Sequence, residues 1–95
     1  MLEVLLRVKE IKEEKNRVYE LLQSLPVDIW PSEANFLLFR PKGIDGYKLW
    51  GDLLNEGILL RDCSSWENLE GCLRVTIGTP NENTKFLERL REILG

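Results

Sequence analysis

The sequence contains no histidine, only two cysteines and no long apolar run. The absence of histidine excludes a nucleophile of the serine–histidine type, because no imidazole is present to activate Ser64 or Ser65. Structural zinc takes four ligands from cysteine and histidine, so Cys63 and Cys72 make a poor zinc site and we expect no metal. Two cysteines are also too few for a secreted disulfide framework, and we interpret both as free thiols in a reducing cytosol.

An excess of positive charge is also lacking. The chain has 13 basic and 16 acidic side chains, a formal net charge of −3. Domains that bind nucleic acid carry a basic patch or stripe, so this balance argues against a nucleic-acid partner. The apolar start is interrupted by Glu3 and Arg7, and is too short for a signal peptide or a membrane span. We therefore expect a cytoplasmic protein with no membrane partner.

What is present is a composition of the globular kind, 43% hydrophobic and 31% charged, in a length typical of one domain. Residues 2–25 have apolar side chains at spacings of three, four or seven, including Val8 and Val18, which predicts an amphipathic helix. On its charged face, Glu13 and Arg17 are spaced to form an ion pair. No capping residue precedes Leu2, so we expect this helix to lead in from a preceding domain.

The rest of the chain alternates between strand and helix patterns. Residues 27–30 predict an edge strand, 35–40 a buried strand, 58–61 a second short strand and 73–77 an alternating strand. Residues 45–56 predict a helix with Tyr47 and Leu54 on its apolar side. Thr79, Pro80 and Glu82 form a capping box that starts a last helix, ending at Leu94. This order predicts a two-layer α/β sandwich, with a small, mostly antiparallel sheet of three or four strands packed against helices.

Two arginines on predicted strands form a candidate anion site. Arg74 lies on the face of its strand opposite Leu73 and Val75, and Arg61 ends another strand. A guanidinium fits a carboxylate or phosphate with two parallel hydrogen bonds, so the pair could converge on one dianion. The alternatives are a solvent-facing Arg74 and an Arg61 that pairs with an acid. Asn35 opens a strand, where turn chemistry or a hydrogen bond across an interface are both open.

Three motifs then occur in order. They are PSEANFLL at 31–38, GILLRDCS at 57–64 and GCLRVTIGT at 71–79, the last followed by Glu82 and Asn83. They resemble the P-S-x-A-N-F, G-[IV]-x-[IV]-R-[DE] and C-L-R-[IV]-[ST]-[IV]-G-T segments of the histidinol-phosphate aminotransferase family. This family belongs to the fold-type I, pyridoxal phosphate-dependent class I and II aminotransferases, and the resemblance covers nearly all of the chain.

The resemblance implies that residues 1–95 are a single domain, the C-terminal small domain of such an enzyme. Family members transfer an amino group between histidinol phosphate and 2-oxoglutarate in histidine biosynthesis. It implies substrate-binding roles for Arg74 and Arg61 at the phosphate or carboxylate, and a place near the active site for Asn35. The cofactor lysine lies in the family's large domain, so we expect no pyridoxal phosphate on this chain alone and no activity from it. The implied partners are that large domain, the phosphorylated substrate and a second subunit of a homodimer.

Two other interpretations of the sequence remain open. The first is the small domain of a threonine-phosphate decarboxylase, a near relative with similar motifs and a phosphorylated substrate. The second is a stand-alone, non-catalytic module of ferredoxin-like type that binds an anion or a partner.

Overall fold

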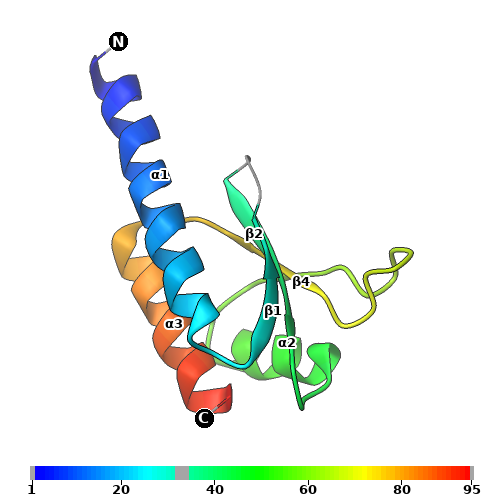
Figure 1. Cartoon of the computed structure of the whole chain (residues 1–95). Coiled ribbons are helices and arrows are strands. Elements are labelled where there is room, and N and C mark those ends of the chain that lie inside the picture. The colour runs from blue at the N-terminus through cyan, green and yellow to red at the C-terminus, as the bar shows by residue number, and fades with distance from the viewer. Residues whose placement is uncertain (1, 32–34, 95) are drawn as a thin grey trace.

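The computed structural model describes residues 2–31 and 35–94. The predicted element order is confirmed (Figure 1). The helices are α1 (Leu2–Gln23), α2 (Gly46–Asn55) and α3 (Pro80–Leu94), and the strands are β1 (Val27–Trp30), β2 (Phe36–Pro41), β3 (Arg61–Asp62) and β4 (Leu73–Thr76).

The four strands form one antiparallel sheet in the order β1-β2-β4-β3. β1 and β2 are a hairpin in which Trp30 lies opposite Leu38. β4 pairs with β2 on one side and with β3 on the other, so it is a central strand although it is the last of the four strands along the chain. The predicted α/β sandwich with a small antiparallel sheet is therefore confirmed, with four strands.

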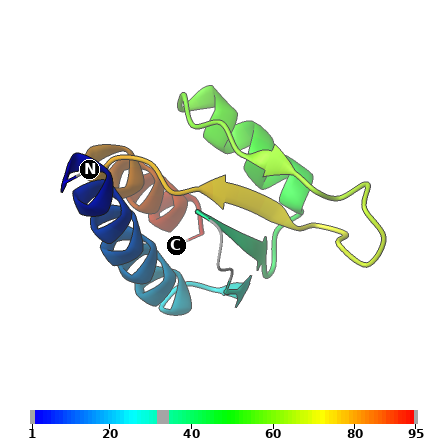
Figure 2. The same ribbon diagram turned by 90° about the horizontal axis from the view of Figure 1, so that it is seen from above.

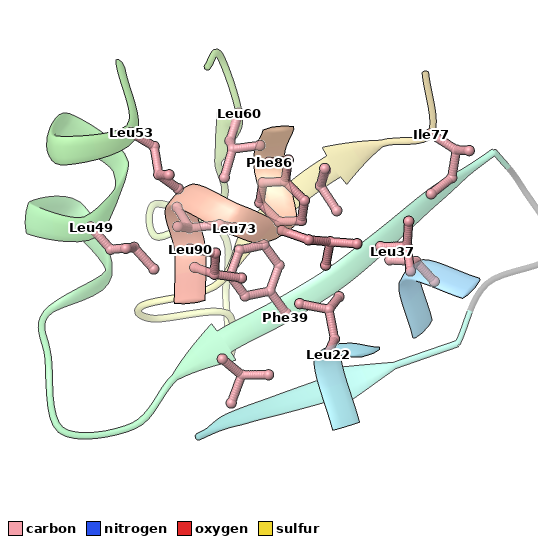
Figure 3. Packing of buried hydrophobic residues seen from close by; sticks show 14 residues of the cluster. Leu22, Leu37, Phe39, Leu49, Leu53, Leu60, Leu73, Ile77, Phe86 and Leu90 are labelled. Atoms are coloured by element: carbon pink, nitrogen blue, oxygen red, sulfur yellow. The ribbon is translucent and has the colours of Figure 1, made fainter. Parts of the chain in front are cut away.

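One face of the sheet carries the core. Along β2 and β4, every second residue is buried. These buried residues join side chains from all three helices in a single cluster, so the helices cover the same face of the sheet (Figures 2 and 3). The ring centroids of Phe39 and Phe86 lie 5.9 Å apart in a tilted arrangement. The fully buried members with the largest side chains include Phe39, Leu22, Leu37, Leu49, Leu53, Leu73 and Leu90.

Two strand predictions need correction. The segment 35–40 was expected to be buried on both faces, but Phe36 and Leu38 are only half-buried because no helix covers their side of the sheet. The segment 58–61 was expected to be a strand, but pairing begins only at Arg61. Ile58 and Leu60 still pack on the core, so their apolar character reflects burial and not strand pairing.

The helices also differ in detail from their predictions. Val8 is 51% exposed, although it belongs to the apolar stripe of α1, because the first half of this helix extends beyond the sheet (Figure 1). On α2, Tyr47 is 63% exposed and Leu54 is exposed as well, so its apolar side is wider than the part that the core covers. Arg17 pairs with Glu14 and not with Glu13. None of the described helices is apolar over a length sufficient to cross a bilayer.

The capping box at the start of α3 is confirmed in both directions. The backbone amide of Thr79 donates to Glu82 Oε1 at 3.0 Å, and the amide of Glu82 donates to Thr79 Oγ1 at 3.2 Å. These bonds satisfy amides that a helix start otherwise leaves without partners. They fix the direction in which the chain leaves β4.

Candidate anion-binding site

The sheet has one face that points away from the helices, which we call the open face. Its residues alternate with the buried ones, as the strand period of two requires. Across it, Trp30, Leu38, Arg74 and Arg61 occupy facing positions on β1, β2, β4 and β3. The four form a row that runs from an apolar edge to a cationic edge.

Arg61 and Arg74 are directly opposite each other in the pairing of β3 with β4. Facing residues of an antiparallel pair have their Cα atoms about 4.5–5.5 Å apart and their side chains on one face. Like charges in this position destabilise a sheet. Two guanidinium groups are thus held together in a place where fold stability alone disfavours them.

Aromatic rings hold both guanidinium groups. The Cζ atom of Arg74 lies 5.0 Å from the ring centroid of Phe36, and that of Arg61 lies 5.3 Å from the ring of Trp66. Stacking of this kind orients a guanidinium without using its N–H donors. Sequence reasoning missed both rings, because Phe36 reads as a core residue and Trp66 lies in a loop.

The donors of the arginine pair are not used within the fold. Among the side chains of residues 8–31 and 35–94, no carboxylate lies within 4.0 Å of Arg61 or Arg74, and the buried Nε of Arg74 has no acceptor. Asp62, the acid next to Arg61 in the chain, accepts from the backbone amide of Ser64 at 2.9 Å and does not pair with Arg61. A buried donor without a partner is costly, and an anion is the ligand that satisfies it.

Asn35 lies away from this pair. Its backbone carbonyl accepts a hydrogen bond from the amide of Ile77 at 2.8 Å, so it continues the pairing of β2 with β4. Since Leu38 is the residue opposite Arg74, Asn35 is three positions further along the strand, about 10 Å away. The structure therefore brings two of the three predicted site residues together and leaves the third at the end of the sheet.

A second polar cluster fixes the chain immediately after β4. Glu14 Oε1 accepts from Arg17 Nη2 at 2.7 Å and from Asn83 Nδ2 at 3.1 Å. Asn83 is almost fully buried and bonds both backbone groups of Gly78, at 2.9 and 3.0 Å. The bonds from Arg17 and Asn83 lower the pKa of Glu14, and the carboxylate raises the pKa of Arg17. Sequence reasoning noted Asn83 only as part of a motif and did not predict this role.

A groove of about 530 Å³ lies between α1 and α3, on the helical side of the molecule. Of its two arginines, Arg17 is already paired with Glu14 and Arg91 is exposed to solvent, whereas the Nε of Arg74 is buried and has no partner. The chemistry therefore favours the arginine pair over the groove. The groove is lined by Arg17, Leu21, Ser24, Leu25, Pro26, Thr84, Leu87, Glu88 and Arg91.

The residues present do not fit attachment of pyridoxal phosphate. Five of the six lysines are exposed, Lys15 is partly exposed, and none lines the groove, so no lysine side chain is enclosed in a pocket. Two are also engaged in ion pairs, Lys42 with Asp28 at 3.5 Å and Lys48 with Asp52 at 3.0 Å. In the described part of the chain, no group of three or more potential metal ligands occurs either. The candidate site of this domain is therefore the arginine pair on the open face.

Comparison with known proteins gives this site a context. The family model described as aminotransferase class I and II matches residues 2–90. A histidinol-phosphate aminotransferase of Aquifex aeolicus is 40% identical over 87 residues, which are 90% of this chain and 24% of that protein. Another, from Synechococcus sp. (strain JA-3-3Ab), is 47% identical over 88 residues, or 88% of this chain and 22% of that protein.

Solved structures agree. The histidinol-phosphate aminotransferase of Clostridium acetobutylicum superimposes with a TM-score of 0.81 at 35% identity, over 87% of this chain and 26% of that one. An L-threonine-O-3-phosphate decarboxylase from Porphyromonas gingivalis gives a TM-score of 0.73 at 27% identity, over 87% and 27%. The chain thus spans about a quarter of the length of the proteins that it matches.

Proposed function

This chain belongs to the aminotransferase class I and II family, and from that premise we propose that it is the C-terminal small domain of a histidinol-phosphate aminotransferase. The names of its relatives and the extent of the match support this proposal. The family depends on pyridoxal phosphate, which supplies an electron sink for amino-group chemistry. In the proposed enzyme the cofactor is held by a large domain, the partner of this chain, and the whole is a cytoplasmic homodimer.

The observation that carries the proposed role is the arginine pair on the open face. An enzyme that moves an amino group between histidinol phosphate and 2-oxoglutarate must accept a phosphate and a carboxylate in one pocket. The guanidinium groups of Arg74 and Arg61 can each receive either anion with two parallel hydrogen bonds. Binding energy from this remote anion then orients the amine for reaction elsewhere in the substrate. Asn35, about 10 Å from this pair, keeps only the place near the active site that the resemblance implies.

Titration with inorganic phosphate tests the anion site. We expect phosphate, substituted for chloride at constant ionic strength, to raise the midpoint of thermal unfolding, because a ligand stabilises the state that binds it. Arg61→Gln and Arg74→Gln should each weaken phosphate binding by about tenfold or more, as loss of a charge-assisted bond predicts. Lys12→Gln, which removes one positive charge from an exposed position of α1 outside the groove and away from the arginine pair, is the matched control. Equal loss in all three variants would contradict a defined site.

Activity tests the larger proposal. We expect no turnover of histidinol phosphate by the 95-residue chain, and measurable turnover would contradict its role as a partial domain. A second candidate, the small domain of a threonine-phosphate decarboxylase, is favoured by the structural match to the enzyme from P. gingivalis. Joining the chain to the large domain of each relative and assaying both substrates distinguishes the two. Release of carbon dioxide from threonine phosphate, without transamination of histidinol phosphate, would favour the decarboxylase.

A further inference from the structure

The two cysteines face each other at the base of the loop between β3 and β4. The backbone amide of Cys63 donates to the carbonyl of Cys72 at 3.0 Å. This bond continues the pairing of Arg61 with Arg74 and of Asp62 with Leu73 by one more step. Both thiols are free and both are buried, with 0% and 1% of their surface exposed.

The backbone at this step suits a disulfide. Facing residues that share a hydrogen bond in an antiparallel pair have Cα atoms about 5.5 Å apart, within the range of about 4.4–6.8 Å found for disulfides. Facing side chains also lie on one side of the sheet. Since Cys63 comes two residues after Arg61 and Cys72 two before Arg74, that side is the one occupied by the arginine pair.

The loop of residues 64–71 joins the two cysteines and has few backbone hydrogen bonds. Its backbone hydrogen bonds run from Trp66 to Cys63, from Leu69 to Trp66 and from Cys72 to Leu69, at 3.0–3.1 Å. Trp66 and several of its neighbours are exposed. Local opening of this loop breaks these bonds, the bond from the Ser64 amide to Asp62 and the stacking of Trp66 on Arg61. It leaves the core intact, so it requires less free energy than global unfolding, and it gives small reagents access to the thiols.

We propose that Cys63 and Cys72 form a reversible dithiol–disulfide pair that exchanges with low-molecular-weight disulfides such as glutathione disulfide. The thiolate of one cysteine attacks a sulfur of glutathione disulfide, the S–S bond breaks, and one glutathione leaves as a thiol. The second cysteine then attacks the mixed disulfide and releases the other glutathione. In sum, the protein loses two protons and two electrons, and glutathione disulfide gains them as it is reduced to two glutathione thiols. This pair does not depend on the proposed enzyme function.

The disulfide has a structural effect on the anion site. It links the end of β3 to the start of β4 and closes the loop that carries Trp66, so it holds Arg61 opposite Arg74. In the reduced protein, burial raises the pKa of both thiols, an effect that the nearby Arg74 and Arg61 partly offset at Cys63. The dithiol is therefore protonated at neutral pH, and exchange is slow and accelerates as the pH rises.

Equilibration in glutathione buffers at increasing oxidised fraction tests the pair. The wild-type chain should become two hydrogen atoms lighter, remain monomeric, lose both reactive thiols and recover them with dithiothreitol. Trypsin releases residues 62–74 as one peptide, which carries both cysteines. Further cleavage after Glu67 or Glu70 divides this peptide between them, so its halves stay joined only if the internal disulfide is present.

Matched variants sharpen the result. Cys63→Ser and Cys72→Ser should each acquire one glutathione and no internal bond. The oxidised wild-type chain should show a higher midpoint of urea unfolding than the reduced chain, and neither variant should show this shift. The proposal is overturned if the wild-type thiols stay free at every glutathione ratio, if each binds its own glutathione, or if they join only between chains. The wild-type mass alone decides between these outcomes, so a poorly folding variant does not weaken the test.

Discussion

Glu14 on α1 and Asn83 on α3 are joined by a hydrogen bond of 3.1 Å between their side chains, although 69 positions separate them in the chain. Asn83 also holds the amide and the carbonyl of Gly78. One amide side chain thus connects the first helix, the last helix and the segment that leaves β4.

Replacing Asn83 by alanine should destabilise the protein by about 1–3 kcal/mol, because backbone groups of Gly78 and the carboxylate of Glu14 lose a partner in a part-buried place. Urea unfolding followed by circular dichroism measures this loss. Asn81→Ala, at an exposed position two residues earlier, is the control and should change the free energy of unfolding by no more than about 0.5 kcal/mol. Equal effects would show that the network contributes nothing.

The hydrogen bonds of Glu14 with Arg17 and Asn83 also predict that the stability of the fold depends on pH. Bonds from Arg17 and then Asn83 lower the pKa of Glu14 in the folded protein. A carboxyl group whose pKa is lower in the folded than in the unfolded protein stabilises the fold at pH values above its unfolded pKa, about 4.3 for glutamate. This stabilisation is lost as the pH falls through the pKa of the folded state. Glu14→Gln should therefore flatten the fall in stability below that pH, while Glu13→Gln should not. Glu82, whose pKa the Thr79 bonds also lower, leaves part of the acid response in place.

Two glycines of α2 should respond in opposite ways to alanine. A methyl group at Gly46 would overlap the backbone carbonyl of Gly71, with the carbonyl carbon only 2.8 Å away, whereas nothing lies within 4 Å of one at Gly51. We expect Gly46→Ala to cost about 1–3 kcal/mol and Gly51→Ala to gain about 0.5–1 kcal/mol. Thermal unfolding of the two variants checks the sign of each change. A neutral Gly46→Ala would mean that the loop of Gly71 yields easily.

The cap of α3 gives a further prediction. Thr79→Ala removes the acceptor for the amide of Glu82 and should cost about 1 kcal/mol. Thr79→Ser keeps the hydroxyl and should cost less than the alanine change. Chemical denaturation of both variants against the wild-type chain measures the difference, and equal losses would point to the methyl group instead of the cap.

Much of the fold could be predicted because local signals and packing agree. The capping box, the alternation around Arg74 and the glycine at position 57, with φ of 80°, each specify local geometry that tertiary contacts leave unchanged. Where local signals and tertiary packing disagree, the sequence-based prediction is wrong. Ile58 and Leu60 are apolar for the core and lie beside a strand of only two residues.

The candidate site could be predicted in part. Mid-strand placement identified Arg74, but the register that sets Arg61 opposite it depends on β4 lying between β2 and β3, which no local pattern specifies. The stacking of Trp66 on Arg61 depends on how a turn-rich loop folds back. The contact of Glu14 with Asn83 could not be predicted either, because it joins two helices that are far apart in the sequence.

The central place of β4 also governs the order of assembly. The β1–β2 hairpin contains only near neighbours and can form as soon as residue 41 is available, whereas its other edge pairs with residues 73–76. Non-local pairing of this kind slows folding, because a long segment must be ordered before the contact forms. Until β4 and α3 dock, Leu37 and Phe39 remain exposed to solvent, and the unpaired edge of β2 can pair with strands of other chains. The nascent domain is therefore most prone to aggregate in the interval between completion of β2 and arrival of Phe86.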